Sequence, residues 1–287
     1  MNSSEKRAKF RAVLGGSQVA VAASVFDPIS ARIADRVGFE VGLMGGSLAS
    51  FTVLGAPDLI LITLSELAEQ CKRACRASRV SLLVDADHGY GNALNVMRTV
   101  EELEAAGVAA LTIEDTSLPR RFGAGGAAEL TSIEEGVAKM KAALAARRDP
   151  GLVIVGRTSA TVISGLDDAI ARLRAYAASG VDALMVPGVK NRAELDRIAD
   201  AVSVPLVTGG SSEELSDLTY LASRRVRVFS QGHQAFAASV KAIHDTMVAI
   251  RNGTPASKLA NIADKELMDH VTRATDFAAH AKAYLGK

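Results

Sequence analysis

The sequence predicts an α/β protein with a single (β/α)8 barrel of the TIM type, an N-terminal helix before it and a C-terminal helical tail after it. Three observations lead to this prediction. Short aliphatic runs alternate with longer amphipathic segments along the 287 residues. The runs are almost continuously apolar, which is typical of parallel strands buried on both faces. There are eight of them, and eight β/α units close naturally into a barrel.

The elements can be assigned in chain order. The N-terminal helix is expected at about 4–14. The segments between the aliphatic runs, such as NVMRTVEELEAAG, carry apolar residues at intervals of three and four, and several end in glycine, as helices often do. No linker divides 1–287, so we expect one domain, with the barrel at about 17–250 and the helical extension at about 251–287. The eight expected strands are 19–25, 40–46, 80–86, 109–115, 152–158, 183–188, 205–210 and 226–232.

An open, doubly wound sheet is the alternative architecture. Such a sheet would normally carry a glycine fingerprint at its first strand–helix turn. The corresponding segment here is VFDPISAR, which has no glycine. The barrel is therefore the favoured fold.

Composition narrows the function classes. The chain is 48% hydrophobic, has a formal net charge of +1 and contains no basic run, which argues against nucleic acid as the main partner. No stretch approaches the roughly 18 consecutive apolar residues of a membrane span, and no signal-type segment is present, so a cytoplasmic enzyme is expected. Cys71 and Cys75 are four residues apart on one expected helix face, which indicates packing, not a metal site.

Polar residues gather where the expected strands end. Barrel enzymes place their chemistry on the loops that follow the strands, where side chains from different strands converge. These positions hold Ser47 after the second strand, Asp85 and Asp87 after the third, Glu114 after the fourth, Arg157 on the fifth and His233 after the eighth.

The acids among these residues need positive partners. Burying an unpaired carboxylate costs several kcal/mol or shifts its pKa until it binds a proton. Arg157 alone cannot neutralise Asp85, Asp87 and Glu114, whereas a hard divalent cation such as Mg²⁺ can. An ion-pair network at a loop rim is the alternative interpretation. Glycines at 45 and 46 would let the backbone approach a ligand, although Ser47 could equally be an ordinary helix cap.

The ordered segments MGGSLAS, APD at 56–58, VDADHGYGN, LTIEDT and GRTSA resemble the isocitrate lyase/phosphoenolpyruvate mutase superfamily over nearly the whole chain. The resemblance implies a Mg²⁺ site, with Mn²⁺ as a possible substitute, and a small oxoacid substrate. It also implies a homotetramer, a dimer of dimers in which the eighth helix and the tail are exchanged between subunits. Asp85 is the implied direct metal ligand, and Asp87, Glu114 and Asp58 are implied to act through water.

The resemblance also assigns the substrate site. Gly46 and Ser47 would hold the carboxylate or enolate oxygen of the substrate, and Arg157 and His233 would orient its carboxylates. Ser47, Arg157 and His233 are the expected catalytic residues. Ser159 stands where relatives more usually have Asp or Asn, and the role of His88, beside two acids, stays open.

The segment after the fourth strand separates the branches of the superfamily. The C–C lyases carry a Lys-Arg/Lys-Cys-Gly-His sequence there, whereas this chain has Phe122 in place of the cysteine and lacks the Lys and Asn-Ser elements of the phosphonate branch. Decarboxylation of a β-oxoacid needs an electron sink but no such acid–base group. We therefore expect Mg-dependent decarboxylation of oxaloacetate to pyruvate and CO2 through an enolate. The alternatives are a C–C lyase for a 2-hydroxy diacid of the methylisocitrate or dimethylmalate type, and a non-catalytic oxoacid-binding relative.

Overall fold

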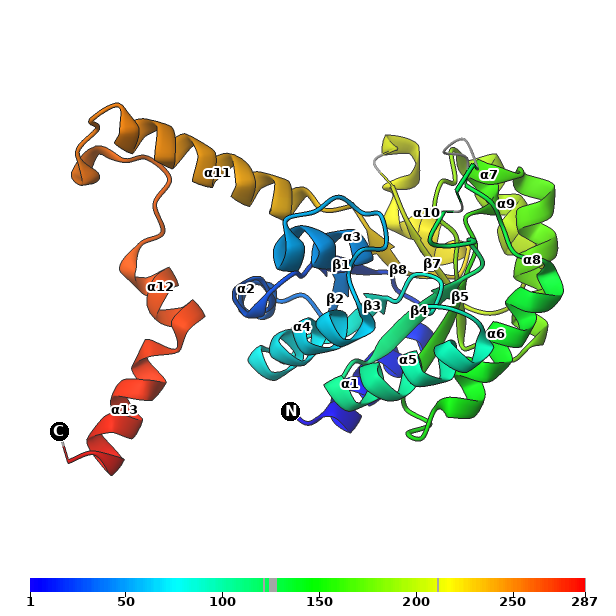
Figure 1. Ribbon diagram of the computed structural model, residues 1–287, viewed down its shortest axis with the longest axis horizontal. Helices are drawn as coiled ribbons and strands as arrows, with labels where there is room; N and C mark the ends of the chain where they lie inside the picture. Colours follow the sequence, from blue (N-terminus) through cyan, green and yellow to red (C-terminus); the bar gives the residue numbers. More distant parts are fainter. Residues whose placement is uncertain (121, 124–127, 211, 287) are drawn as a thin grey trace. The chain divides into compact units, whose positions relative to one another are not determined.

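Eight parallel strands form a closed barrel in strand order β1 to β8, as the sequence predicts (Figure 1). We describe a computed structural model for residues 1–120, 122–123, 128–210 and 212–286. Every expected strand is present within one to three residues of its predicted ends. The strands are β1 Ala20–Ser24, β2 Val41–Met44, β3 Ser81–Asp85, β4 Ala110–Glu114, β5 Val153–Arg157, β6 Ala183–Met185, β7 Leu206–Gly209 and β8 Val226–Ser230.

The helices of the barrel follow the strands. Several begin at a side chain that accepts hydrogen bonds from the first turn, as Asp27, Thr63 and Asn92 do for α2, α4 and α5. They are α2 Pro28–Val37, α3 Gly46–Ala49, the π-helical turn η1 Ser50–Leu54, α4 Leu64–Ala77, α5 Ala93–Ala106, α6 Ile133–Ala146, α7 Ala160–Ile163, α8 Leu166–Ala178, α9 Arg192–Ala201, η2 Glu213–Leu215 and α10 Leu218–Ser223.

The chain divides into two compact units, Met1–Gly232 and His233–Lys287. The first holds the barrel. The second consists of α11 Gln234–Arg251, η3 Ala256–Lys258, α12 Lys265–Thr272 and α13 Ala274–Tyr284. The single domain over 1–287 that is expected from the sequence stays a prediction. Over the described residues, no helix combines the length and the apolar character that crossing a membrane requires.

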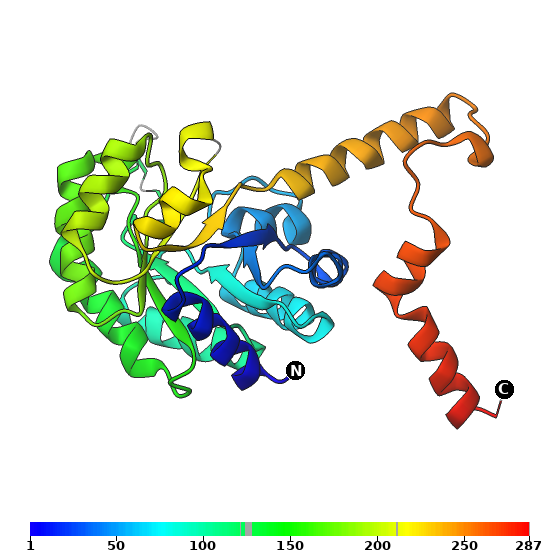
Figure 2. The same cartoon turned by 180° about the vertical axis from the view of Figure 1, so that it is seen from behind.

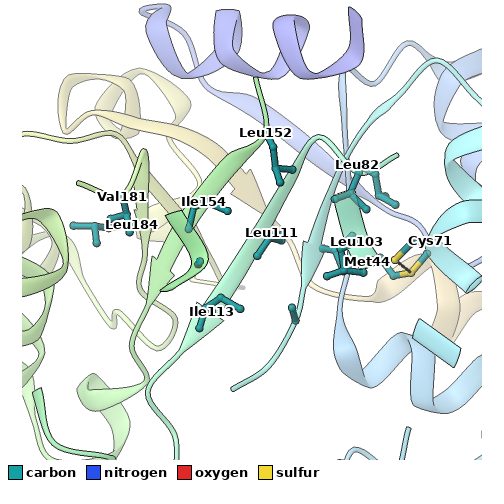
Figure 3. Packing of buried hydrophobic residues seen from close by; sticks show 14 of the residues in the cluster. Met44, Cys71, Leu82, Leu103, Leu111, Ile113, Leu152, Ile154, Val181 and Leu184 are labelled. Carbon is teal, nitrogen blue, oxygen red and sulfur yellow. Dashed lines mark hydrogen bonds between the residues drawn. The ribbon is translucent and has the colours of Figure 1, made fainter. Parts of the chain in front are cut away.

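Alternation along the strands sorts side chains into two cores. Leu111 and Ile113 of β4 and Ile154 of β5 belong to the layer between the strands and the helices, together with Met44 and Cys71 (Figure 3). The residues between them face the barrel interior, where Ala110, Val153 and Val155 pack together. Cys71 and Cys75 are buried free thiols, and burial raises the pKa of Cys75 to about 11, so both serve packing.

The N-terminal helix α1, Ser3–Gly15, closes one end of the barrel (Figure 2). Phe10 and Leu14 are part of the interior core. Arg7 donates a hydrogen bond of 3.1 Å to the carbonyl of Val108, just before β4, and Arg11 donates one of 3.0 Å to the carbonyl of Gly151, just before β5. Helix α1 therefore lies at the amino-terminal ends of the strands and completes the interior core at that end of the barrel.

This arrangement makes Phe10 a stability determinant. Phe10→Ala removes a ring that is 0% exposed and leaves a cavity in the interior core, which should lower the free energy of unfolding by about 3–5 kcal/mol. Urea unfolding followed by circular dichroism measures this loss. Phe122→Ala is the matched control because Phe122 is fully exposed, and its effect should stay within about 0.5 kcal/mol. Equal losses in the two variants would contradict the conclusion that α1 completes the interior core through Phe10.

Candidate active site

Three charged side chains occupy the last interior-facing positions of neighbouring strands. On β5, Val153 and Val155 face the interior, so Arg157 at the next alternate position faces the same way. The same alternation places Glu114 after Ala110 and Thr112 on β4, and Asp85 after Leu83 on β3. The strand register puts Glu114 directly opposite Arg157. The sequence prediction that these residues meet at the carboxyl-terminal end of the barrel is consistent with this geometry.

Arg157 binds two of the acids. Its Nη1 donates to Oδ2 of Asp85, and its Nε lies 3.1 Å from Oε2 of Glu114. The second carboxylate oxygen of Asp85 accepts hydrogen bonds from the hydroxyl of Thr112 at 3.0 Å and from the amide of Asp87 at 3.2 Å. Ser159 donates at 3.3 Å to Glu114, so the unusual serine supports an acid of the site. Nothing in the sequence pointed to Thr112 except its position on the interior-facing side of the fourth strand.

Asp87 stands apart from this ion-pair network. Its backbone has φ 48°, a left-handed conformation that is uncommon outside glycine, and its carbonyl accepts the amide of Glu114 at 2.8 Å. Its Oδ2 is buried and has no hydrogen-bond partner among the described residues. The carboxylate packs against Gly46, where an added Cβ would lie 2.7 Å from both oxygens. A side chain at position 46 would therefore displace the carboxylate of Asp87, which explains one glycine of the MGGS segment.

The pKa shifts follow from these contacts. Burial alone would raise the pKa of Asp85, but the charge and hydrogen bond of Arg157 lower it below its ordinary value. For Glu114, burial dominates and raises the pKa in spite of Arg157. Burial, reinforced by the charges of Asp85, Glu114 and Asp58, raises the pKa of Asp87 well above its ordinary value. The protein by itself thus leaves one acid of the cluster without a compensating positive charge.

These residues line a cavity of about 410 Å³. Its described lining includes four carboxylates, Asp58, Asp85, Asp87 and Glu114, against two guanidinium groups, Arg120 and Arg157. The remaining lining residues are Leu59, Ile60, Thr116, Leu118, Pro119, Ala128, Ser159, Val162 and Ile163. Three of the four acids lie in or directly after β3 and β4, whereas the apolar lining residues belong to the segments that follow the strands.

The acidic side fits a hard divalent cation. It offers carboxylate oxygens, which Mg²⁺ prefers, and a positive ion there would neutralise the excess negative charge and give the orphaned oxygen of Asp87 a partner. Over the described residues, no three His, Cys, Asp or Glu side chains already enclose a metal position. This is compatible with Mg²⁺, which takes few protein ligands and keeps several waters.

The other expected site residues have different surroundings. Ser47 is half-buried in the first turn of α3, next to Gly46. His233 precedes α11 in the second unit, so its assignment to the substrate site stays a prediction. Phe122 is described and exposed, whereas residues 121 and 124–127 of the glycine-rich segment lie outside the described residues.

A buried contact between His88 and Lys139 supports the loop that carries part of the acid cluster. His88 is buried, and burial together with the nearby charge of Lys139 lowers its pKa to about 4, so the imidazole is neutral at pH 7. Lys139 of α6 is 2% exposed and donates a hydrogen bond of 3.0 Å to the carbonyl of His88. It thereby holds the loop that carries Asp87. Lys139 could not be identified from the sequence because a lysine on an amphipathic helix ordinarily faces solvent.

Comparison with known proteins agrees with the fold. Residues 10–251 match the family model described as phosphoenolpyruvate phosphomutase. A curated relative from Rhodopseudomonas palustris (strain BisB18), named oxaloacetate decarboxylase, is 57% identical over 281 residues, which cover 98% of this chain and 97% of the relative.

Two solved structures are similar over nearly the whole chain. Oxaloacetate acetylhydrolase in complex with the inhibitor 3,3-difluorooxalacetate has a TM-score of 0.87 and 25% identity, covering 98% of this chain and 97% of its own. Phosphonopyruvate hydrolase in complex with oxalate and Mg²⁺ has a TM-score of 0.87 and 26% identity, covering 99% of this chain and 100% of its own. The chain thus belongs to the phosphoenolpyruvate phosphomutase family of enzymes.

Proposed function

We propose that this enzyme decarboxylates oxaloacetate to pyruvate and CO2 with the help of Mg²⁺. The observation that carries the proposal is the lining of the cavity. It contains the acidic cluster and Arg157, but no cysteine, histidine or lysine among the described lining residues. Cleavage of a 2-hydroxy acid needs a base for the hydroxyl proton and an acid for the leaving group. Decarboxylation needs neither, and the 57% identity to an oxaloacetate decarboxylase supports the same reaction.

Each residue has a role in this proposal. Asp85 would bind Mg²⁺ directly, and Asp87, Glu114 and Asp58 would hold it through intervening water. A bound Mg²⁺ supplies a Lewis acid beside the ketone of the oxoacid. Gly46 and Ser47, at the first turn of α3, would place backbone amides and a hydroxyl next to the ketone oxygen as negative charge develops there. Mn²⁺ has the same preference for oxygen ligands and is the expected substitute.

The reaction itself is a single bond cleavage. The bond between C3 and C4 of oxaloacetate breaks, CO2 leaves, and the electron pair remains as the enolate of pyruvate, which takes a proton from solvent. Arg157, together with His233, would orient the substrate carboxylates. The apolar lining residues Leu59, Val162 and Ile163 would offer the leaving carboxylate no hydrogen-bond donor from their side chains, which favours its loss as neutral CO2.

Metal dependence tests the reaction. Purified protein with oxaloacetate and Mg²⁺ should form pyruvate faster than the spontaneous rate, and excess EDTA should remove this acceleration. Lactate dehydrogenase and NADH report pyruvate. Asp85→Ala should reduce turnover to the spontaneous rate while the circular dichroism spectrum stays unchanged. Absence of EDTA-sensitive acceleration would refute the proposal, and formation of glyoxylate or succinate from isocitrate-like substrates would favour a C–C lyase.

Arg157 should contribute to transition-state binding. Arg157→Ala removes a buried guanidinium with two carboxylate partners, and we expect a loss of about 2–4 kcal/mol, which is roughly 30- to 900-fold in kcat/KM. Arg197→Ala is the matched control because Arg197 pairs with Asp167 in an exposed ion pair. A kcat/KM equal to wild type in Arg157→Ala would remove this residue from the site.

We propose in addition a homotetramer, a dimer of dimers with exchanged C-terminal helices. Helix α11 has no buried residue, and Val240, Ile243, Met247 and Ile250 are each more than half exposed at spacings of three and four. Such an apolar stripe is typical of a helix that packs against another surface.

The mass in solution tests this assembly. Light scattering after gel filtration should give about four times the chain mass of 29.9 kDa. Ile243→Asp combined with Met247→Asp should lower that mass because charges would be buried in the contact. Lys241→Asp, at an exposed position of the same helix that pairs with Asp245, serves as the control. A monomeric wild type would contradict the proposed exchange.

A further inference from the structure

A buried ion pair lies behind the candidate active site, on the side away from the cavity. Asp115, which follows β4, is 0% exposed, and its Oδ2 accepts two hydrogen bonds. One comes from Nη1 of Arg172 on α8 at 2.9 Å, and the other from the hydroxyl of Tyr176 at 2.6 Å. None of these three residues is among the described residues that line the cavity.

Arg172 joins the two ends of one segment, 116–130. The same Nη1 donates a hydrogen bond of 2.9 Å to the carbonyl of Thr131, and the amide of Thr131 donates one of 2.8 Å to the carbonyl of Asp115. Next to this junction, Thr116 pairs with Leu130 as an antiparallel bridge. The two ends of the segment are therefore joined by backbone hydrogen bonds, and the guanidinium group of Arg172 ties this junction to α8.

Described residues of the segment that Arg172 fixes form one wall of the cavity. Thr116, Leu118, Pro119, Arg120 and Ala128 all line the cavity, and all belong to the segment 116–130. This wall is thus tied to α8 by a residue that does not itself line the cavity.

Arg172 also reaches a second wall. Its Nε donates a hydrogen bond of 2.9 Å to Oδ2 of Asp168, which also accepts the hydroxyl of Ser164 at 2.5 Å. Ser164 directly follows α7, whose residues Val162 and Ile163 line the cavity. One side chain therefore connects the wall after β4 with the wall after β5.

A buried ion pair is a poor source of net stability, because apolar packing of similar volume often stabilises a fold as well. What the ion pair provides is a fixed geometry, since the planar guanidinium meets its partners in only one arrangement. We propose that Arg172, held by Asp115 and Tyr176, is a positioning residue that sets the spacing between the two cavity walls and thereby the affinity for the substrate. This inference rests on the proposed function for its substrate.

Arg172→Lys and Tyr176→Phe test the inference. Lysine keeps the charge but cannot contact Asp115, Thr131 and Asp168 together, and Tyr176→Phe removes one donor to Asp115. Arg172→Lys should raise KM for oxaloacetate about tenfold, and Tyr176→Phe should raise it by less. In both variants kcat should stay within about threefold of wild type. Hydrogen exchange, measured by mass spectrometry, should become faster in peptides covering 116–120 and 128–131.

Arg7→Lys is the matched control. Arg7 is also buried and also binds a carboxylate, Asp149 at 2.7 Å, and backbone carbonyls, but it lies at the opposite end of the barrel. A general effect of replacing a buried arginine would change KM to the same extent in Arg7→Lys and Arg172→Lys. An equal rise of KM in Arg7→Lys and Arg172→Lys, or an unchanged KM in both Arg172→Lys and Tyr176→Phe, overturns the inference.

The outcome is separable from that of the proposed function. Should wild-type protein fail to decarboxylate oxaloacetate, the proposed function fails, and the affinity for oxalate with Mg²⁺, measured by calorimetry, replaces KM. Weaker oxalate binding and faster exchange in Arg172→Lys, but not in Arg7→Lys, would still support the positioning role. Unchanged oxalate affinity and unchanged exchange would reject it.

Discussion

The ion pairing of Arg157 with Asp85 and Glu114 is the interaction on which the candidate active site depends. Three adjacent strands, β3 to β5, each end in a charged interior-facing side chain, and a barrel mouth has little water to screen them. One guanidinium between two carboxylates makes the cluster stable. The same arrangement leaves Oδ2 of Asp87 without a partner and disfavours the ionised form of this acid, which is the electrostatic basis for placing a divalent cation beside it.

The support for this cluster comes from the outer helices. Lys139 of α6 holds the carbonyl of His88, and Thr99 of α5 donates a hydrogen bond of 3.0 Å to the carbonyl of Gly89. These two contacts fix a loop in which Asp87 and Gly89 both have positive φ. Arg172 of α8 does the same for the neighbouring segment. The helices thus do more than cover the strands, because polar side chains on their inner faces determine the shape of the loops that carry the acids.

The strands and the central residues of the site could be predicted from the sequence. Eight continuous apolar runs identify the strands, and the alternation along β3, β4 and β5 brings Asp85, Glu114 and Arg157 together. The contact between Gly46 and Asp87 could not be predicted, since it depends on how two loops approach each other. Lys139 and Arg172 were missed for a related reason. Each bonds a residue more than fifty positions away, and a helical pattern does not distinguish a buried basic residue from a solvated one.

The position of α1 has a consequence for how the molecule is made. It packs against β3, β5 and β8, so an element that precedes all eight strands in the sequence contacts the last of them. During translation the surface that binds this helix is incomplete until residue 230 has left the ribosome. Closing of the barrel therefore also completes the docking surface of α1, and an N-terminal fusion that sequesters α1 would leave the interior core exposed at that end.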